Sequence, residues 1–588
     1  MEATILLIAG IAFAPVVLAQ FVTAPQDLTA VRGNGYQVRY KEVESGICET
    51  VSSVRSYSGY IDVEEHQHLF FWFFEARNQD PSTAPLTLWL NGGPGDPSMV
   101  GLFSENGPCW IDYNGTLQVN ENSWTNVSNV LYLDQPTDTG FSYSIPVNGY
   151  IDAATGHLVE LPNATCPDYA TADSCGTYAS SNVSYTVNNT LAAAPYVWKA
   201  FQGFTGAFPQ YAQNGVYLST ESYGGHFGPV FADFILDQNV RKEGAHIDLR
   251  GLSVGNGWFD PIIQFEQQDR RLRSMGIKFA GRETDQRQAY YNYTVNPGNS
   301  FNFHPFNATT QAHMENALYG EGNCLDQLYA CNYGPGTDGI CSAADNFCYD
   351  EVEYVFDTVT GRDEYDIREL TPDPFPYTSW VAYLNRPEIQ KAIGAYTNFT
   401  YSVTNLGAGT VATAFGTTGD DSRGFDIIAR NRRLINNGVY VVHYAGDADY
   451  NCNWIGGEEV ARQIDASGFT SAGYQNLTTS TFAANGPKSA ITEQVHGVVK
   501  QASNYAFARI YDSGHQVPFY KPKAALALFE RLVKRTDIAT GKERIDQKYK
   551  YVSVGPRKSE YRNDPRTIQE HVVDASCLWD SETNLPAC

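Results

Sequence analysis

The sequence predicts an α/β protein with a mostly parallel central sheet and helices on both faces. Short apolar runs alternate with segments of helical periodicity, as in chains whose parallel strands are joined by crossover helices. One such run leads into a serine flanked by small residues, and a helical pattern follows it. A long segment, 261–387, breaks the alternation and is rich in Tyr, Asn, Gln and Cys, so we expect an inserted cap domain there.

The individual elements follow from these patterns. The expected strands are 68–75, 86–90, 130–133, 216–219, 249–254, 439–444 and 507–511. Residues 521–535 have the apolar spacing of an amphipathic helix and carry cations in the last turn, where the helix dipole favours them.

The chain divides into several expected parts. Residues 5–19 form a short terminal apolar run that is typical of a signal peptide. No other segment is apolar enough to span a bilayer, and the polar C-terminus does not fit a lipid-anchor signal, so we expect no membrane anchor. The parts are a signal peptide at 1–19, a core in two pieces at 20–260 and 388–535, a cap at 261–387, a glycosylated surface insertion at 146–190, and a charged extension at 536–588.

Charge and sequons indicate the partners and the compartment. The formal charge of -25 and the pI near 4.8 disfavour nucleic acid and anionic membranes as partners. Nine N-x-S/T sequons favour the secretory route, so we expect a secreted protein, with a vacuole or lysosome-like compartment as the alternative. The candidate acceptors are Asn114, Asn126, Asn163, Asn182, Asn188, Asn292, Asn307, Asn398 and Asn476.

The eleven cysteines of a secreted chain suggest five disulfides and one odd thiol. Four of them form a symmetric cluster whose spacing favours nested pairing, Cys324 with Cys348 and Cys331 with Cys341. Cys166 and Cys175 could close one local loop, and Cys577 and Cys588 another. The spacing does not fit a zinc ribbon, so we predict no metal site.

The segment 215–226 (GVYLSTESYGGH) predicts a catalytic serine. A strand enters a tight turn around Ser222, which is how an α/β-hydrolase presents its nucleophile above the sheet. Thr220 stands where the usual G-x-S-x-G pattern has its first glycine. Glu221 is unusual beside a nucleophile, because an ionised carboxylate there would repel an anionic substrate.

Candidate partners of the serine follow two later strands. In α/β-hydrolases the chain order is serine, aspartate, histidine, with each residue just after a strand. Asp447 and Asp449 follow the strand expected at 439–444, and His515 follows the one at 507–511. The glycine-rich loop 91–95 (NGGPG), after an earlier strand, supplies main-chain amides that can approach a ligand closely, as an oxyanion hole requires.

Four motifs together resemble the serine carboxypeptidase family, which includes carboxypeptidase Y and secreted fungal acid carboxypeptidases. In the family's order they are NGGPG at 91–95, ESYGGH at 221–226, DADYNCNW at 447–454 and GHQVP at 514–518. The resemblance covers about residues 36–535. It implies an α/β-hydrolase fold with an inserted cap, no cofactor, and cleavage of peptides or proteins with a free C-terminus through an acyl-enzyme.

The resemblance also implies a role for each matching residue. The catalytic set is Ser222 as nucleophile, His515 as general base and acid, and Asp449 as orienting carboxylate, with Asp447 structural. The amides of Gly93 and Tyr223 match the oxyanion hole. The residues that match the site for the substrate's terminal carboxylate are Asn91, Gly92 through its amide, Glu105 and Glu221.

Physical chemistry explains the carboxylate-binding set. Two carboxyls in a dry pocket cannot both ionise cheaply, so at least one pKa rises. A protonated carboxyl donates a hydrogen bond to the substrate carboxylate, whereas an ionised one repels it. His515 must be neutral to act as a base, so the two requirements together predict a mildly acidic optimum.

The chain departs from the family at several positions. Asp96-Pro97 replaces the Cys-Ser that usually follows the glycine loop, and Cys48 or Cys109 would have to compensate, for example by pairing with each other. Cys452 matches a free thiol of carboxypeptidase Y and is the expected odd cysteine. Gln516 replaces a Met after the histidine and makes the leaving-residue pocket more polar. By spacing, Val100 and Ser104 are expected to line the same region. The NGWFDP segment 256–261 is expected to shape the cap entrance and to take no part in the chemistry.

We therefore expect a secreted, glycosylated serine carboxypeptidase that acts at acidic pH. One alternative is a family-related acyltransferase or lyase, which the carboxylate-binding set disfavours because those reactions offer no terminal carboxylate. The other is a non-catalytic secreted glycoprotein, which the complete triad disfavours. Side-chain preference and oligomeric state do not follow from the sequence.

Overall fold

The computed structural model describes most of the chain from residue 21 onward. The described ranges are 21–112, 114–265, 289–294, 299–371, 373, 375–376, 378–401, 410–482, 491–545, 550–559, 578–580 and 585–587. The expected signal peptide at 1–19 and the expected Cys577–Cys588 pair lie outside these residues.

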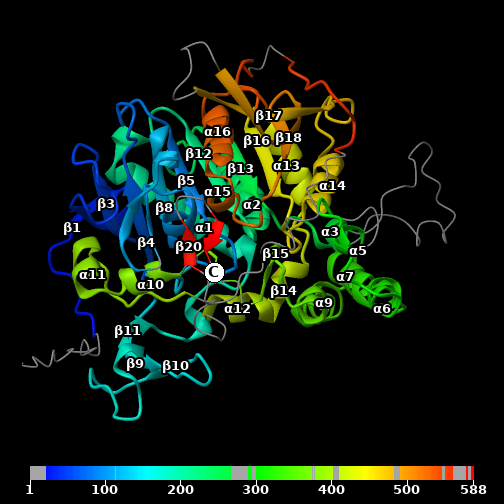
Figure 1. The fold of residues 1–588 in the computed structure, drawn as a ribbon. Coiled ribbons are helices and arrows are strands. Elements are labelled where there is room, and N and C mark those ends of the chain that lie inside the picture. The colour runs from blue at the N-terminus through cyan, green and yellow to red at the C-terminus, as the bar shows by residue number, and fades with distance from the viewer. Residues whose placement is uncertain are drawn as a thin grey trace, which may run out of the picture.

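A mixed twelve-stranded sheet runs through the centre of the molecule (Figure 1). Its order is β1-β2-β3-β4-β8-β5-β12-β13-β16-β19-β18-β17. The six strands from β8 to β19 are parallel, which confirms the predicted parallel centre. Both edges are antiparallel.

The parallel strands are the apolar runs of the sequence. They are β5 (Leu86–Leu90), β8 (Asn129–Leu133), β12 (Val216–Glu221), β13 (Leu249–Gly255), β16 (Tyr440–Gly446) and β19 (Tyr505–Ile510). Almost every residue in them is buried, because helices cover both faces of a parallel sheet. The run predicted at 68–75 is β4 (Gln67–Phe74), which pairs antiparallel with β8.

The antiparallel edges were not predicted. They consist of β1 (Thr29–Gly33), β2 (Tyr36–Val43) and β3 (Ser56–Glu64) on one side, and β17 (Tyr474–Phe482) and β18 (Ile491–Ala502) on the other. These strands mix polar with apolar residues, so no continuous apolar run marks them. Residues 536–545 and 550–558 pack beside this second edge, where Ile538, Ala539 and Ile545 are buried. The first part of the expected charged extension therefore belongs to the core.

Helices lie on both faces of the sheet, as predicted. One face packs against α1 (Thr190–Ala207), α2 (Gly224–Arg241), α13 (Ile427–Asn436) and α14 (Trp454–Ile464). The other face packs against α16 (Pro522–Val533), the helix predicted at 521–535, which follows the short α15 (Val517–Tyr520). Alternation along β5 shows the division, because Leu88 lies in one apolar cluster and Trp89 in the other.

The expected insertion at 146–190 contains a small sheet of its own. Its strands are β9 (Pro146–Ile151), β10 (Leu158–Glu160) and β11 (Cys175–Ala179), in the order β10-β9-β11. Two short turns, η3 (Ala172–Ser174) and η4 (Val183–Tyr185), accompany them. A disulfide joins Cys166 to Cys175, which closes the local loop that the sequence suggested.

Between residues 261 and 422 the described part of the chain is mainly helical (green to yellow-green in Figure 1). Its elements are α3 (Pro261–Phe265), α5 (Ala289–Thr294), α6 (Ala308–Tyr319), α7 (Cys324–Tyr333), α8 (Asp338–Cys348), η6 (Tyr349–Glu353), α9 (Val355–Thr360), β14 (Arg362–Asp363), β15 (Asp366–Leu370), α10 (Ser379–Leu384), α11 (Pro387–Ile393), α12 (Thr410–Thr418) and η7 (Asp420–Ser422). Disulfides Cys324–Cys348 and Cys331–Cys341 join α7 to α8, with the nested pairing expected from the spacing.

Packing does not follow the expected cap boundaries closely. Elements α12 and η7, which the sequence analysis placed in the second core piece, contact α8 of the cap range. Conversely, α10 falls within the expected cap range, yet it packs on β6 (Cys109–Ile111) and buries Trp380 in a core cluster.

The remaining short elements are η1 (Gly101–Glu105), β7 (Leu117–Val119), η2 (Trp124–Asn126), η5 (Pro209–Tyr211), β20 (Leu578–Asp580) and β21 (Leu585–Ala587).

Two further expectations from the sequence have clear outcomes. Cys48 pairs with Cys109, so these cysteines do bind each other, and Cys452 is free and buried. Asn398 was an expected glycosylation site, but its side chain is buried at 6% exposure and accepts a hydrogen bond from the Thr177 amide. This side chain is therefore less accessible than those of the exposed sequons, and glycosylation at Asn398 stays a prediction. The other sequons in the described residues remain predicted sites.

Candidate active site

Ser222 lies on a sharp turn between β12 and α2. Its φ is +62°, a left-handed conformation that side chains other than glycine rarely adopt. Neighbouring glycines make the turn possible, since a Cβ on Gly224 would lie 2.4 Å from the Thr220 Cβ. A Cβ on Gly225 would lie 2.3 Å from the Trp258 carbonyl oxygen. Thr220 therefore replaces the usual glycine without a clash, because the opposing residue has no side chain.

A buried chain of hydrogen bonds leads from the strand ends to His515. Asp449 is fully buried, and its Oδ2 lies 2.8 Å from His515 Nδ1. The same oxygen accepts a 2.6 Å hydrogen bond from Asn256 Nδ2, and Oδ1 accepts one from the Cys452 amide. With a carboxylate facing Nδ1, that nitrogen carries a proton and Nε2 is left as the basic atom.

Asn256 corrects the sequence analysis, which assigned the NGWFDP segment to the cap entrance. Its side chain holds Asp449 directly, and its Oδ1 accepts a hydrogen bond from the Gly446 amide. Two residues later, the Trp258 amide donates to the Ser222 carbonyl at 2.8 Å. The position of this segment just after β13 was the available signal, since polar residues at the carboxyl ends of parallel strands gather at one edge.

The glycine loop packs directly on the serine turn. A Cβ on Gly92 would lie 2.4 Å from the Tyr223 nitrogen and 2.9 Å from the Ser222 Cβ, so only glycine fits there. Within the described residues, neither the Gly93 nor the Tyr223 amide donates a backbone hydrogen bond. Tyr223 also begins α2, whose positive end faces the same space. Two free amides at a helix N-terminus suit a developing negative charge on oxygen.

Asn91, Glu105 and Glu221 form a buried polar group beside this loop. The Asn91 Oδ1 accepts hydrogen bonds from Trp89 Nε1 and the Gly101 amide, which orients its amino group. That amino group donates to Glu105 Oε1 at 3.2 Å. Glu105 is 5% exposed and Glu221 is 2% exposed, and one carboxyl oxygen of each lacks a hydrogen-bond partner among the described residues.

The two glutamates perturb each other. Burial raises the pKa of Glu221 well above its usual value, and the charge of Glu105 and a hydrogen bond with it raise the pKa further. Burial also raises the pKa of Glu105, although hydrogen bonds from Glu221 and Asn91 partly oppose this. The pair therefore keeps a proton at pH values at which an exposed glutamate is ionised, and the pKa of Glu221 is raised the more strongly.

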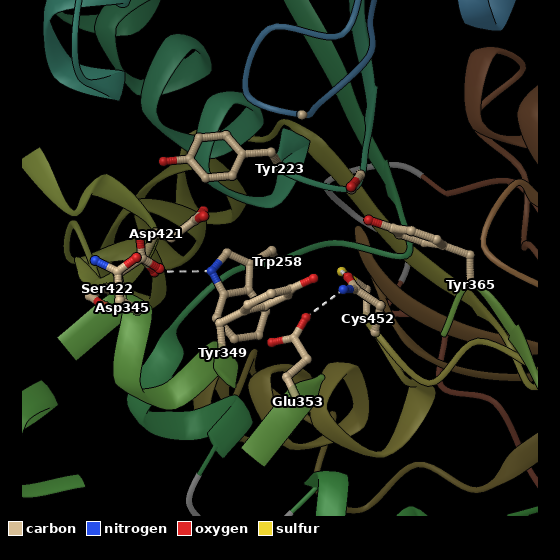
Figure 2. Close-up of a pocket in the computed structure, with 13 residues that line it drawn as sticks. Tyr223, Trp258, Asp345, Tyr349, Glu353, Tyr365, Asp421, Ser422 and Cys452 are labelled. Atoms are coloured by element: carbon tan, nitrogen blue, oxygen red, sulfur yellow. Dashed lines mark hydrogen bonds between the residues drawn. The ribbon is translucent and has the colours of Figure 1, made fainter. Parts of the chain in front are cut away.

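Two cavities adjoin the serine turn. The first has a volume of about 300 Å³ and is lined by Gly93, Ser222, Tyr223, Trp258, Asp345, Asn346, Tyr349, Glu353, Tyr365, Asp421, Ser422, Asn451 and Cys452. Figure 2 shows Asp345, Asp421 and Ser422 on one side, Tyr365 and Cys452 on the other, and Trp258 between them. The second, about 350 Å³, shares Gly93, Asp345, Tyr365 and Asp421 with the first and adds Asp96.

The first cavity is strongly acidic. Burial raises the pKa of Asp345 to about 7, with a contribution from the charge of Asp420. Burial also raises the pKa of Glu353 and of Asp421 well above their usual values, and neighbouring carboxyls add to both shifts. Among the described residues that line the two cavities there is no Lys, Arg or His.

A hairpin formed by β14 and β15 holds the two catalytic loops together, which the sequence did not indicate. The Glu364 carbonyl accepts hydrogen bonds from the Tyr450 and Asn451 amides, next to Asp449. The adjacent Tyr365 carbonyl accepts from the His515 amide at 2.9 Å, and the Tyr365 ring packs edge-on against the imidazole. One turn of the hairpin thus fixes both partners of the Asp449–His515 pair.

The remaining predicted residues divide into two groups. Asp447 is structural, as expected, since its Oδ1 accepts from the Asp512 amide and its Oδ2 lies 3.4 Å from Arg509. By contrast, Val100, Ser104 and Gln516 line neither of the two cavities described above, so their assignment to a substrate pocket gains no support. Ligand atoms of Asp449, Cys452 and His515 lie within 4.8 Å of one another, but Asp449 and His515 already bind each other there.

Comparisons with known proteins agree on one family. A family model described as serine carboxypeptidase matches residues 46–535. Carboxypeptidase S1 of Penicillium janthinellum is 34% identical over 84% of this chain and 99% of its own length. Carboxypeptidase S1 homolog B of Arthroderma otae is 34% identical over 95% of this chain and 86% of its own length. The crystal structure of Kex1(Δ)p, a prohormone-processing carboxypeptidase from Saccharomyces cerevisiae, matches with a TM-score of 0.58 and 20% sequence identity. The match covers 84% of this chain and 95% of that structure, and it shows a similar fold.

We expect Glu221→Gln to flatten the pH dependence of the melting temperature. Since the pKa of Glu221 is raised in the folded state, its contribution to stability is full below the usual pKa of glutamate, about 4.3, and is lost as the pH rises toward the folded value. Glutamine cannot ionise, so the fall in Tm between pH 4 and 7 becomes shallower. Calorimetry of the variant beside Glu243→Gln, an exposed control, measures this. If the slope of Tm against pH were equal in both variants and in the parent, the inference that the Glu105–Glu221 pair is protonated would be contradicted.

Proposed function

The chain belongs to the serine carboxypeptidase family, and from this membership we propose that Ser222, His515 and Asp449 are its catalytic triad. The observation that carries the proposal is the buried Asn256–Asp449–His515 chain, which lies at the strand ends beside the strained Ser222 turn. The protein is thus a serine carboxypeptidase whose three catalytic side chains come from the turns after β12, β16 and β19.

The geometry supports acyl transfer through the serine hydroxyl. His515 Nε2 accepts the proton of the Ser222 hydroxyl as its oxygen attacks the last peptide carbonyl of the substrate. The Gly93 and Tyr223 amides stabilise the oxyanion. The imidazolium then gives the proton to the departing amine, and water releases the acyl group by the reverse sequence. Asp449 stabilises the imidazolium and is itself kept oriented by Asn256.

The buried polar group beside the glycine loop supports recognition of a free C-terminus. Glu221 holds a proton that it can donate to a substrate carboxylate, and Asn91 and the Gly92 amide offer further donors. Recognition then requires Glu221 to stay protonated, while catalysis requires His515 to be neutral. Together these needs favour action at acidic pH. An acyltransferase or lyase would have no use for such a site.

The acidic cavity supports a preference for a cationic side chain on the acyl side of the bond. Ser222 and Tyr223 line this cavity, whereas Asn91, Glu105 and Glu221 do not, so it accommodates the residue before the scissile bond. Carboxyls of Asp345, Glu353 and Asp421 face it with no cation among its lining residues. A lysine or arginine side chain would relieve their mutual repulsion and could also pack on the aromatic walls.

The secretory route is supported by disulfides and sequons. Four disulfides occur in the described residues, and such bonds persist in oxidising compartments. None of the described helices is long and apolar enough to cross a membrane. We propose secretion, with an acidic vacuole-like compartment as the alternative, and glycosylation at exposed sequons such as Asn163 and Asn307.

Ser222→Ala is expected to lower kcat on a blocked dipeptide by at least about a thousandfold, because the covalent step is lost. The parent should react with a serine-directed fluorophosphonate at Ser222, and the variant should not, as mass spectrometry of the labelled peptide would show. A variant that kept its turnover or its label would disprove the assignment of the nucleophile.

The carboxylate site predicts two effects on kcat/KM. Amidation of the substrate C-terminus should lower kcat/KM by about a hundredfold, because the partners of the carboxylate are lost. Glu221→Gln keeps a donor but cannot ionise, so the alkaline fall in kcat/KM should become shallower. Profiles between pH 4 and 8 for both substrates test this. Equal cleavage of the free and amidated substrates would exclude an exopeptidase.

The acidic cavity predicts a charge-dependent preference. The ratio of kcat/KM for Arg over Met at the penultimate position should rise from pH 5 to pH 7, because the pKa of Asp345 is raised to about 7 by burial and this carboxyl ionises over that range. Asp345→Asn should lower the ratio at pH 7 by about three- to tenfold, within the range for partly buried charge pairs. Glu243→Gln makes the same charge change far from the cavity and should leave the ratio unchanged. If Asp345→Asn left the ratio at pH 7 unchanged, the proposed preference would be refuted.

A further inference from the structure

Asp420, on the short turn η7, binds the residue that follows the nucleophile. Its Oδ2 accepts a 2.6 Å hydrogen bond from the Tyr223 hydroxyl. The same oxygen accepts from the hydroxyl and the amide of Thr190, at 2.6 and 2.9 Å, at the start of α1. Asp420 is 1% exposed and Tyr223 is 2% exposed, so neither group exchanges these bonds for water.

The turn that carries Asp420 is itself fixed. Gly419 has φ +58°, and a Cβ there would lie 2.1 Å from the Cys341 carbonyl carbon, so the turn fits tightly against α8. The Asp421 carbonyl accepts from Trp258 Nε1 at 3.0 Å, and the Trp258 amide holds the Ser222 carbonyl. Figure 2 shows the Tyr223 hydroxyl pointing to the side of the cavity on which Asp421 lies.

Tyr223 therefore connects two fixed points. At one end its backbone nitrogen lies against Gly92, and the residue lines the cavity beside Ser222. At the other end its hydroxyl is bound by Asp420. Between them the ring packs edge-on against His226 and Phe227. Burial and the nearby carboxyls of Asp420 and Asp421 raise the pKa of Tyr223 well above its usual value, so the hydroxyl keeps its proton and remains a donor.

We propose that Asp420 is a positioning residue for the oxyanion hole, which holds the Tyr223 amide in place through the Tyr223 hydroxyl. This inference depends on the proposed role of that amide. Asp420 touches no reacting atom, and its effect is to restrict how far the Tyr223 backbone can rotate away from the developing oxyanion. Preorganised donors lose catalytic power steeply when displaced, because reorganisation must then occur during the reaction.

Tyr223→Phe and Asp420→Ala, which removes the acceptor of the Tyr223 hydroxyl, test the inference as a double-mutant cycle. Each single change should lower kcat on a blocked dipeptide by about tenfold, with KM within twofold of the parent. The double variant should match Tyr223→Phe within twofold, because both changes break the same hydrogen bond. Independent, multiplied losses in the double variant would overturn the proposal, as would a normal kcat in Tyr223→Phe.

Inhibitors distinguish positioning from general loss of structure. A peptide aldehyde that forms a hemiacetal with Ser222 places its oxygen in the oxyanion hole, so its Ki should rise about tenfold in Tyr223→Phe. The Ki of a blocked amino acid with a free carboxylate, a product of the reaction, should stay within twofold. If both inhibitors weakened equally, the substitution would have disturbed the whole site, and the proposal would be wrong.

Tyr211→Phe is the matched control. It removes another buried hydroxyl bound to a buried carboxylate, since Tyr211 donates to Glu75 Oε1 at 2.5 Å. Its Tm should fall as in Tyr223→Phe while kcat stays unchanged. A tenfold loss of kcat in this control would mean that losing any buried hydroxyl lowers kcat, and the double-mutant cycle would then give no support to a positioning role for Asp420. Ser222→Ala separates the two proposals. If Ser222→Ala kept its turnover, the catalytic assignment of Ser222 would be wrong. If Ser222→Ala were inactive and Tyr223→Phe had a normal kcat, only the proposed role of Asp420 would be wrong.

Discussion

The steric crowding at the Ser222 turn is the constraint on which the rest of the site depends. A left-handed serine can be held there only because Gly92, Gly224 and Gly225 leave space that a Cβ would fill. The strain is offset by hydrogen bonds to the turn from Gly225 and Trp258 and to the Gly255 carbonyl. The same lack of side chains lets the glycine loop lie against the Tyr223 amide, so that nucleophile and oxyanion donors arise from one packing arrangement.

A second theme is the burial of carboxyl groups. Glu105 and Glu221 are kept close in a dry site, and Asp345, Glu353 and Asp421 line the adjoining cavity. In each group burial is the main cause of the raised pKa, and mutual repulsion adds to it. In the function proposed above the two groups respond oppositely to pH, because the first binds the substrate carboxylate when protonated and the second attracts a cationic side chain when ionised. In the proposed function, the pH dependence of substrate binding therefore arises from these buried carboxyl groups.

Part of the fold and of the site could be predicted because the relevant signals are local. Apolar runs marked β5, β12, β13 and β16 within a few residues, since parallel strands are buried on both faces. Strands β17 and β18 were not predicted, because polar residues interrupt their apolar residues. Asn256 was misassigned for a related reason, as nothing near it in sequence indicates that Asp449 will face it.

The sequence by itself determined the order of the motifs and the nested Cys324–Cys348 and Cys331–Cys341 pairing, and it named the residues of the proposed triad and of the proposed carboxylate-binding set. These depend on spacing within short segments or on a family pattern. Only the tertiary structure decided that Asn256 supports Asp449, that the Tyr365 turn holds His515, and that Asp420 holds Tyr223. The physical reason is that these hydrogen bonds join residues about 150 to 200 positions apart. Such contacts are set by how the sheet and helices pack, and no local periodicity records them.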